Sequence, residues 1–214
     1  MYKHILFDLD GTLTDSKYGI IKSIQYALSK EGIEQVELKD LQKFVGPPLK
    51  ESFMEYYSFD EETAERAIDN FREYFKDKGI FENEVYIGIP ELLSYLKNKG
   101  YCISIATSKP TIFAKKIIKH FKLEKYFLKI VGSNLDGTRT SKGEVIEYLL
   151  KELDVKNTDK IVMIGDRKHD VLGAKMNNLH SIGVAYGYGC IEELESAGAN
   201  YIVESIDELY KKFA

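Results

Sequence analysis

The chain opens on Tyr2-Lys3-His4-Ile5-Leu6-Phe7-Asp8-Leu9-Asp10-Gly11-Thr12, and this stretch decides its fold. The apolar run before the acids is typical of a buried strand. Side chains alternate along a strand, so Asp8 and Asp10 are predicted to point to the same side, with Gly11-Thr12 forming a tight exit. Two like charges about 4 Å apart repel by ~4 kcal/mol at an effective dielectric of roughly 20, so a cation or a shared proton is predicted beside them. Asp-x-Asp-Gly is also a common turn composition, so this stretch taken alone is equally compatible with a loop that has no functional site.

Size and composition describe an ordinary soluble protein of 214 residues, 44% hydrophobic and 30% charged. A net charge of -4 argues against a nucleic-acid or membrane surface, because such surfaces need clustered Lys and Arg. The sequence shows neither a long apolar run nor a signal-like start, so we expect a cytoplasmic protein. Cys102 and Cys190 lack CxxC spacing, which supports neither a zinc site nor a disulfide framework and predicts buried or incidental thiols.

Hydrophobic periodicity divides the chain into two regions. Residues 15–85 show apolar residues at helical spacing and no convincing strand, whereas from Tyr86 onward apolar strands alternate with amphipathic helices. Such alternation predicts parallel strands joined by right-handed helical crossovers. The predicted fold is α/β, an open parallel (Rossmann-like) sheet flanked by helices, formed by a core domain (1–14 and 86–214) with an all-helical cap domain (15–85) inserted. Core strands are predicted at 5–7, 101–106, 128–131, 161–164, 181–184 and 201–203.

Polar residues follow three of these strands. In open parallel sheets, ligands bind beyond the carboxyl ends of the strands. We expect three groups of polar residues to meet at this edge: Asp8 with Asp10, Thr107-Ser108-Lys109, and Gly165-Asp166. Asp170 is four residues after Asp166, on the same face of a helix that begins near Arg167. Up to four carboxylates would converge there, and an all-oxygen cluster predicts Mg²⁺. The alternative for Asp166 and Asp170 is helix capping.

Hydroxyls and one lysine complete the predicted edge. Thr107 and Ser108 are placed to donate to an anionic oxygen, or are turn residues before Pro110. Ser141-Lys142-Gly143-Glu144 predicts a capping box, with the lysine in the first helical turn, where a cation opposes the helix dipole. Binding of the lysine to an anion or to the carboxylate cluster would compensate for this unfavourable interaction with the helix dipole. A solvated surface lysine is the alternative.

Together these residues resemble the haloacid dehalogenase-like (HAD) hydrolase superfamily, specifically its phosphoglycolate phosphatase-like branch with a helical cap after the first strand. Asp8-x-Asp10-Gly-Thr resembles the first motif and Thr107 the second, while Lys142 resembles the third and Gly165-Asp166 with Asp170 the fourth. The order and the strand placement agree over the whole chain. One departure is the stretch 136–140, Asp-Gly-Thr-Arg-Thr, where many relatives carry a Lys-Pro-x-Pro stretch.

The resemblance implies a magnesium-dependent phosphatase. Asp8 would attack phosphorus to form a phosphoaspartyl intermediate, and Asp10 would act as general acid and base. The resemblance further implies that Mg²⁺ is held by the side chains of Asp8 and Asp166 together with the backbone carbonyl of Asp10, and that Asp170 supports the metal shell. It also implies that Thr107 and Lys142 hold the phosphate oxygens.

Substrate contacts are expected from both domains, from Gly11, Thr12 and Ser108 in the core and from Gly46, Pro47 and Lys50 in the cap. An acid at the position of Asp10 is typical of the phosphatases of this family, whereas its dehalogenases lack an acid there. Thr12 also resembles the phosphatases, because the sugar phosphate mutases more often carry Val at that position. A phosphonate hydrolase stays open but lacks an evident cap lysine. The substrate is a small phosphorylated metabolite, with phosphoglycolate, a nucleoside 5'-monophosphate and a sugar phosphate all open. A non-catalytic relative that binds a phosphorylated ligand is the alternative function.

Overall fold

A computed structural model describes residues 2–45, 49–155 and 157–214 of the protein. The chain divides into two compact units. We call residues 1–15 and 85–214 the core unit and residues 16–84 the inserted unit. The inserted unit interrupts the core unit between residues 15 and 85.

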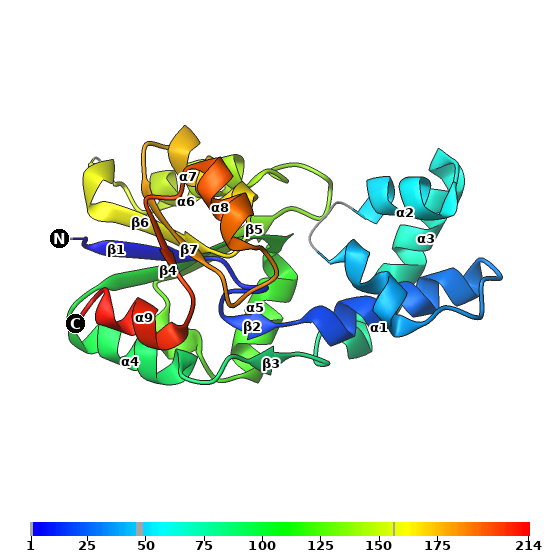
Figure 1. The fold of residues 1–214 in the computed structure, drawn as a ribbon, viewed down its shortest axis with the longest axis horizontal. Coiled ribbons are helices and arrows are strands. Elements are labelled where there is room, and N and C mark those ends of the chain that lie inside the picture. The colour runs from blue at the N-terminus through cyan, green and yellow to red at the C-terminus, as the bar shows by residue number, and fades with distance from the viewer. Residues whose placement is uncertain (1, 46–48, 156) are drawn as a thin grey trace. The chain divides into compact units, whose positions relative to one another are not determined.

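The core unit is built on a six-stranded sheet in the order β5-β4-β1-β6-β7-β8. All neighbouring strands in it run parallel, so the predicted α/β class is confirmed (Figure 1). The strands are β1 (His4–Phe7), β4 (Cys102–Pro110), β5 (Lys129–Ser133), β6 (Ile161–Gly165), β7 (His180–Val184) and β8 (Tyr201–Val203).

Strand β1 lies in the middle of the sheet because its apolar residues need cover on both faces. Ile5, Leu6 and Phe7 are fully buried. Phe7 is in register with Ile105 of β4 on one side and with Ile164 of β6 on the other. The carboxyl ends of these three strands therefore lie next to one another, and the residues that follow them share one edge of the sheet.

Helices cover both faces of this sheet (Figure 1). On one side lie α4 (Ile89–Asn98), α5 (Thr111–His120) and α9 (Ile206–Lys211); on the other lie α6 (Lys142–Glu152), α7 (Lys168–Met176) and α8 (Ile191–Ala197). The chain passes from β5 back across the sheet to β6, so right-handed crossovers place α5 on one face and α6, α7 and α8 on the other. Helix α9 follows the last strand and packs beside α4, where Tyr210 meets Tyr95. Val145, Ile146 and Leu149 of α6 pack on the sheet residues Leu6 and Met163.

Strand β4 is longer than predicted. It runs to Pro110, with a register shift against β5 between Ala106 and Pro110, so Thr107-Ser108-Lys109 lies within an irregular strand end instead of a turn. Gly132 makes this possible, because a Cβ there would overlap the Lys109 carbonyl oxygen. Cys102, at the first position of β4, and Cys190 are both exposed and free, so of the two expected alternatives, buried or incidental thiols, the structure excludes the buried one.

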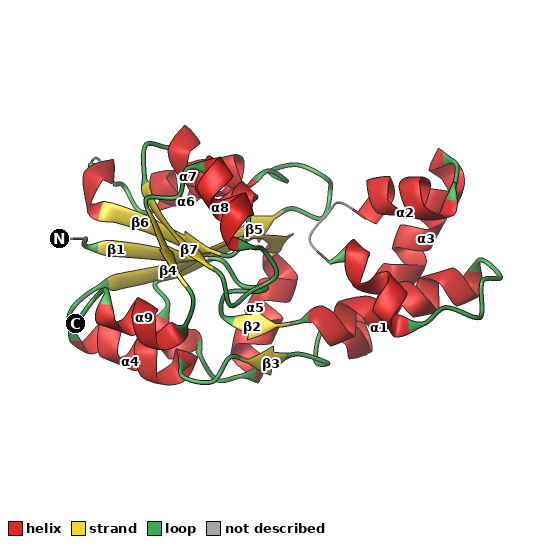
Figure 2. Ribbon diagram, in the orientation of Figure 1, coloured by secondary structure: helices red, strands yellow, loops and turns green. Residues whose placement is uncertain are grey.

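Among its described residues the inserted unit consists of helices and the loops between them, up to Glu84, which begins β3 (Glu84–Val85) (Figure 2). Its helices are α1 (Lys17–Lys30), α2 (Leu49–Tyr57) and α3 (Glu61–Tyr74), with the 3-10 turn η1 (Leu38–Phe44) and the π turn η2 (Phe75–Gly79). β3 pairs with β2 (Thr14–Asp15), a sheet that the sequence did not predict because two-residue strands carry no periodicity. Among the described helices, none combines the length and the apolar character that crossing a bilayer requires.

Candidate active site

Asp8 directly follows β1 and is held by its neighbours on two sides. Its backbone N–H donates to the carbonyl of Ile164 at 2.8 Å, which continues the β1–β6 pairing by one residue. Its side-chain Oδ1 accepts the Leu9 N–H at 2.7 Å and lies 2.7 Å from Lys142 Nζ. Since Oδ1 carries both contacts, Oδ2 is the oxygen favoured for further chemistry.

Strand β6 delivers two more acids, Asp166 one residue after its end and Asp170 in the first turn of α7. Asp166 is fully buried; its Oδ1 accepts the Thr12 hydroxyl at 3.1 Å and its Oδ2 accepts the Tyr188 N–H at 2.8 Å. Asp170 Oδ2 accepts the Arg167 N–H at 3.1 Å. Asp170 therefore caps α7, while Asp166 serves no cap and lies before the helix.

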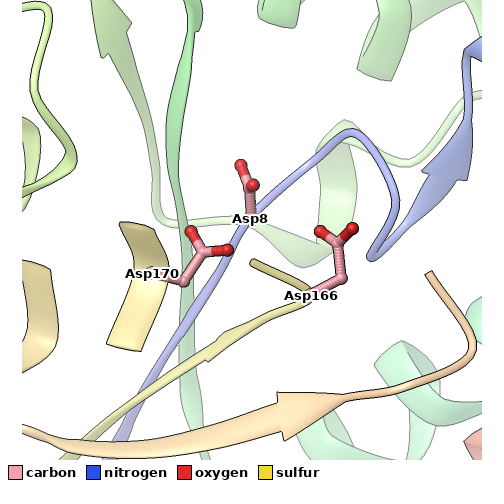
Figure 3. A group of neighbouring side chains, drawn as sticks. All are labelled: Asp8, Asp166 and Asp170. Carbon is pink, nitrogen blue, oxygen red and sulfur yellow. The ribbon is translucent and has the colours of Figure 1, made fainter. Parts of the chain in front are cut away.

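Asp8, Asp166 and Asp170 form one cluster. Each offers an oxygen, and these three oxygens lie within 4.8 Å of one another. The three carboxylates point into the same space from β1, β6 and α7 (Figure 3). Carboxylate oxygens gathered at this spacing are ligands suited to a hard divalent cation.

Burial and mutual repulsion make this cluster electrostatically costly without a metal. Burial, followed by the charges of Asp170 and Asp8, raises the pKa of Asp166 to about 8. Burial also raises the pKa of Asp170, to about 6, against the opposing pull of Lys142. Among the described residues no ion pair reaches Asp166, so without a metal this carboxyl holds its proton up to about pH 8, and a cation beside it would favour its ionised form.

Lys142 supplies the positive charge for the other two acids. Its ammonium lies 2.7 Å from Asp8 Oδ1 and 2.8 Å from Asp170 Oδ1, and donates to the Ala106 carbonyl at 3.0 Å. Burial alone would lower the pKa of Lys142, but the two carboxylates outweigh it and raise that pKa above its ordinary value. The predicted capping box is present at Ser141 and Glu144, and the surface-lysine alternative is wrong because the side chain is 4% exposed.

Asp10 is not one of the three acids of this cluster, of which the sequence predicted up to four. Its Oδ2 pairs with Lys109 Nζ at 3.2 Å. The strand ends at Phe7 and the chain then turns, with Gly11 at a φ of 80° and its N–H donating to the Thr14 carbonyl. Strand alternation therefore does not extend from Asp8 to Asp10.

Of the remaining predicted core residues, Gly11 and Thr12 contact the cluster, and Thr107 follows Ala106, whose carbonyl accepts a hydrogen bond from Lys142. Thr12 bonds Asp166 directly, and a Cβ on Gly11 would overlap the carboxylate of Asp166. Thr107 is buried and its Oγ1 accepts the Lys109 N–H at 3.2 Å, whereas Ser108 is exposed.

Three of the predicted site residues belong to the inserted unit. Gly46 and Pro47 lie outside the described residues. Lys50 lies in the first turn of α2, where its ammonium pairs with Glu65 at 2.9 Å and Glu61 at 3.6 Å.

Comparison with protein families decides what kind of protein carries this site. Residues 5–184 match the family model described as haloacid dehalogenase-like hydrolase. The chain belongs to this family. The match spans the cluster residues Asp8, Asp166 and Asp170, and it confirms the resemblance drawn from the four motifs; phosphoglycolate phosphatases are among the relatives.

Several relatives of this HAD hydrolase carry functional names. The chain is 48% identical over 195 residues to a 5'-nucleotidase of Pseudomonas aeruginosa, covering 91% of this chain and 88% of the relative. It is 36% identical over 207 residues to the tyrosine-protein kinase PtkA of Mycobacterium tuberculosis, covering 96% and 70%. A crystal structure of a predicted phosphatase from Clostridium acetobutylicum superimposes with a TM-score of 0.92 at 60% identity, covering 100% and 98%.

Two features of this HAD hydrolase site escaped the sequence reasoning. Lys109 was seen only as part of a strand end, yet its ammonium pairs with Asp10. Tyr188 was passed over, yet its N–H bonds Asp166. A signal for the second was present in Gly187-Tyr188-Gly189, because glycines on both sides of one residue, just after a buried strand, indicate close backbone approach.

Proposed function

We propose that this protein is a Mg²⁺-dependent phosphatase that hydrolyses a small phosphate monoester through a phosphoaspartyl intermediate, with nucleoside 5'-monophosphates as the substrate class. The observation that carries the proposal is the buried cluster of Asp8, Asp166 and Asp170 beside Lys142. Family membership and phosphatase relatives make the protein a hydrolase of phosphoric monoesters. The nucleotide assignment is supported by the 5'-nucleotidase relative.

The residues present fit Mg²⁺. Three carboxylates supply hard oxygen ligands, and the raised pKa of Asp166, which stems from burial and then from its acidic neighbours, indicates a site whose charge is incompletely neutralised by the chain. Asp8 and Asp166 would hold the ion with the backbone carbonyl of Asp10, and Asp170 would support that shell. When bound, Mg²⁺ neutralises the cluster and stabilises the negative charge of the phosphoryl group.

Formation of the phosphoaspartyl intermediate would start from Asp8. A carboxylate oxygen of Asp8 attacks phosphorus, an O–P bond forms, and the ester P–O bond breaks. The departing oxygen takes its proton from Asp10. Thr107 would donate its hydroxyl to a phosphoryl oxygen, and the Lys142 ammonium would balance the charge on Asp8 and the transferred group.

Hydrolysis of the intermediate would use the same two acids. Asp10, now ionised, takes a proton from water, which attacks phosphorus and releases phosphate from Asp8. The Lys109 ammonium, 3.2 Å from Asp10 Oδ2, holds that carboxylate in place during both steps. Asp8 and protonated Asp10 are then restored.

Transfer of the phosphoryl group to a tyrosine hydroxyl is a second candidate, favoured by the likeness to the relative named as a tyrosine kinase. Such transfer would need the intermediate on Asp8 to react with an alcohol in place of water. A peptide that contains tyrosine, supplied with labelled ATP, separates the two: label on the peptide supports the kinase, whereas an unlabelled peptide together with turnover of a phosphate monoester supports the hydrolase.

Activity against a chromogenic aryl phosphate, with and without Mg²⁺, tests the primary proposal. We expect turnover that requires Mg²⁺, that Asp8→Asn abolishes, and that Asp10→Asn lowers by about two to four orders of magnitude, in line with general acid–base contributions. Metal-independent turnover, or full activity of Asp8→Asn, would overturn the mechanism. A panel of nucleoside 5'-monophosphates, phosphoglycolate and sugar phosphates, compared by kcat/KM, then tests the substrate class.

A further inference from the structure

The loop after β7 lies against the acidic cluster although none of its residues belongs to that cluster. It reads Tyr186-Gly187-Tyr188-Gly189 and follows Val184, the last residue of β7, by one residue. Tyr188 donates its backbone N–H to Asp166 Oδ2 at 2.8 Å. The other oxygen of Asp166 is taken by the Thr12 hydroxyl at 3.1 Å, so two hydrogen bonds fix the rotation of this carboxylate.

Neither glycine of the loop can be replaced by a larger residue without a steric clash. A Cβ on Gly187 would overlap the Gly11 carbonyl oxygen and the Cβ of Asp166, and a Cβ on Gly189 would overlap the Asp166 carbonyl oxygen. Neither glycine is among those with a positive φ, so a larger residue is excluded by contact and not by backbone conformation. The backbone of the loop therefore packs directly on the loop after β1 and on Asp166.

Two tyrosine hydroxyls anchor the loop at separate points of the core unit. Tyr186 donates its hydroxyl to the Thr12 carbonyl at 3.0 Å, and its ring meets Tyr86 edge to face with centroids 5.3 Å apart. The Tyr188 hydroxyl bonds Asp15 Oδ1 at 3.0 Å. These bonds hold the loop against residues 12–15, in the segment that follows β1 and begins with Asp8.

We propose that the loop 186–189 is a positioning element for the metal site, in which the Tyr188 N–H orients the Asp166 carboxylate and Gly187 permits the approach. Partners that orient a ligand from outside the coordination shell typically change metal affinity by about 10- to 100-fold. The inference rests on the proposed function, since it takes Asp166 as a ligand of Mg²⁺. It adds residues that contact no substrate and that act through Asp166.

Titration calorimetry of the metal-free full chain with MgCl₂ tests the inference without any turnover. Gly187→Ala is expected to weaken Mg²⁺ binding by about tenfold or more. Gly183→Ala is the matched control: it lies in the same β7 region, and its Cβ would press on the Leu194 side chain, 2.9 Å away, instead of on Asp166. The control is expected to lower the melting temperature while its Mg²⁺ affinity stays within about twofold of wild type, well below the change expected from a ligand-orienting partner.

If Gly187→Ala does not fold, Tyr188→Phe decides, because it removes the hydroxyl bond to Asp15 that holds Tyr188, and with it the N–H bonded to Asp166, in place. We expect it to weaken Mg²⁺ binding severalfold, whereas Tyr95→Phe, which removes a comparable half-buried hydroxyl bond to the Phe213 carbonyl, leaves affinity unchanged. Wild-type affinity in Gly187→Ala, or in Tyr188→Phe where the first variant is unfolded, would overturn the inference. So would an equal loss in the matched control. Absence of Mg²⁺ binding by the wild-type protein would instead overturn the proposed function.

Discussion

Single side chains at this site are balanced between repulsion and compensation. Asp8 and Asp170 share the Lys142 ammonium, while Asp166 accepts hydrogen bonds from neutral donors. Buried charges are tolerated when they are paired, and removing one partner of a buried pair typically costs about 3–5 kcal/mol. The residues of the cluster should therefore respond to substitution in opposite directions, according to whether a charge is left alone or a repulsion is relieved.

Lys142→Met is expected to lower the free energy of unfolding by about 3 kcal/mol or more at neutral pH, because Asp8 and Asp170 lose their shared cation. Urea denaturation of the metal-free protein measures this. Lys151→Met on the same helix is the control, since its ion pair with Glu147 is exposed and should be worth less than about 1 kcal/mol. Equal losses in both variants would show that Lys142 does not compensate the cluster.

Asp166→Asn should flatten the pH dependence of stability in the metal-free protein. Burial, with Asp170 and Asp8, raises the pKa of Asp166 from its ordinary value to about 8. Between pH 4 and pH 8 the folded state therefore holds a proton that the unfolded state has released, so this group makes stability fall as pH rises. Thermal unfolding at intervals across that range should show a steeper decline for wild type than for Asp166→Asn. A decline of the same slope in both would refute the assignment.

At the scale of whole elements, helix α6 places its catalytic candidate through its first turn. Ser141 accepts the Glu144 N–H, and the Glu144 carboxylate returns to the Ser141 N–H at 3.1 Å, so Lys142 starts the helix in a fixed direction. Close packing supports this arrangement, because a Cβ on Gly173 of α7 would come within 2.9 Å of Lys142 Cγ. The N-terminal cap of α6 thus contributes both to the stability of the helix and to the orientation of the Lys142 side chain.

Ser141→Ala should cost about 1 kcal/mol of unfolding free energy through loss of the helix cap, and it should also lower kcat of the phosphatase. Ser205→Ala is a matched control, because Ser205 caps α9 by accepting the Glu208 N–H and contacts none of the clustered acids. We expect a similar loss of stability and unchanged kcat for the control. Equal kcat in the two variants would mean that the α6 cap does not aim Lys142.

For the whole molecule, metal binding should be linked to folding of the core unit. The cluster is assembled from residues 8, 166 and 170, so its geometry exists only when β1, β6 and α7 are packed together. A ligand that binds only the folded state stabilises it, by about 2.7 kcal/mol at a concentration of roughly 100 times Kd.

Addition of saturating MgCl₂ should therefore raise the melting temperature of the wild-type protein by roughly 5–10 °C, given about 2–4 °C per kcal/mol for a chain of this size. Calorimetry over a series of MgCl₂ concentrations measures the shift, with NaCl at equal ionic strength as the reference. Asp166→Asn should lose most of it. A shift that NaCl reproduces would point to screening of surface charge instead of a bound ion.

Local patterns in the sequence were sufficient for the fold and for most of the candidate residues. The sheet was predicted from the apolar run before Asp8 and from the alternation of strands and helices after Tyr86. Because parallel strands present their carboxyl ends at one edge of a sheet, the same pattern predicted that Asp8 would meet Asp166. The capping box at Ser141 was likewise readable, since its four residues are consecutive. These features depend on neighbours in the chain or on a general rule of topology.

Tertiary structure alone decided how the charges are shared. Asp10 pairs with Lys109, which lies on β4, and Lys142 is buried with its ammonium between Asp8 and Asp170. The bond from Tyr188 to Asp166 joins residues 22 apart through two glycine contacts. The physical reason is that strand register, turn geometry and close backbone approach depend on distant segments, so no local periodicity records them.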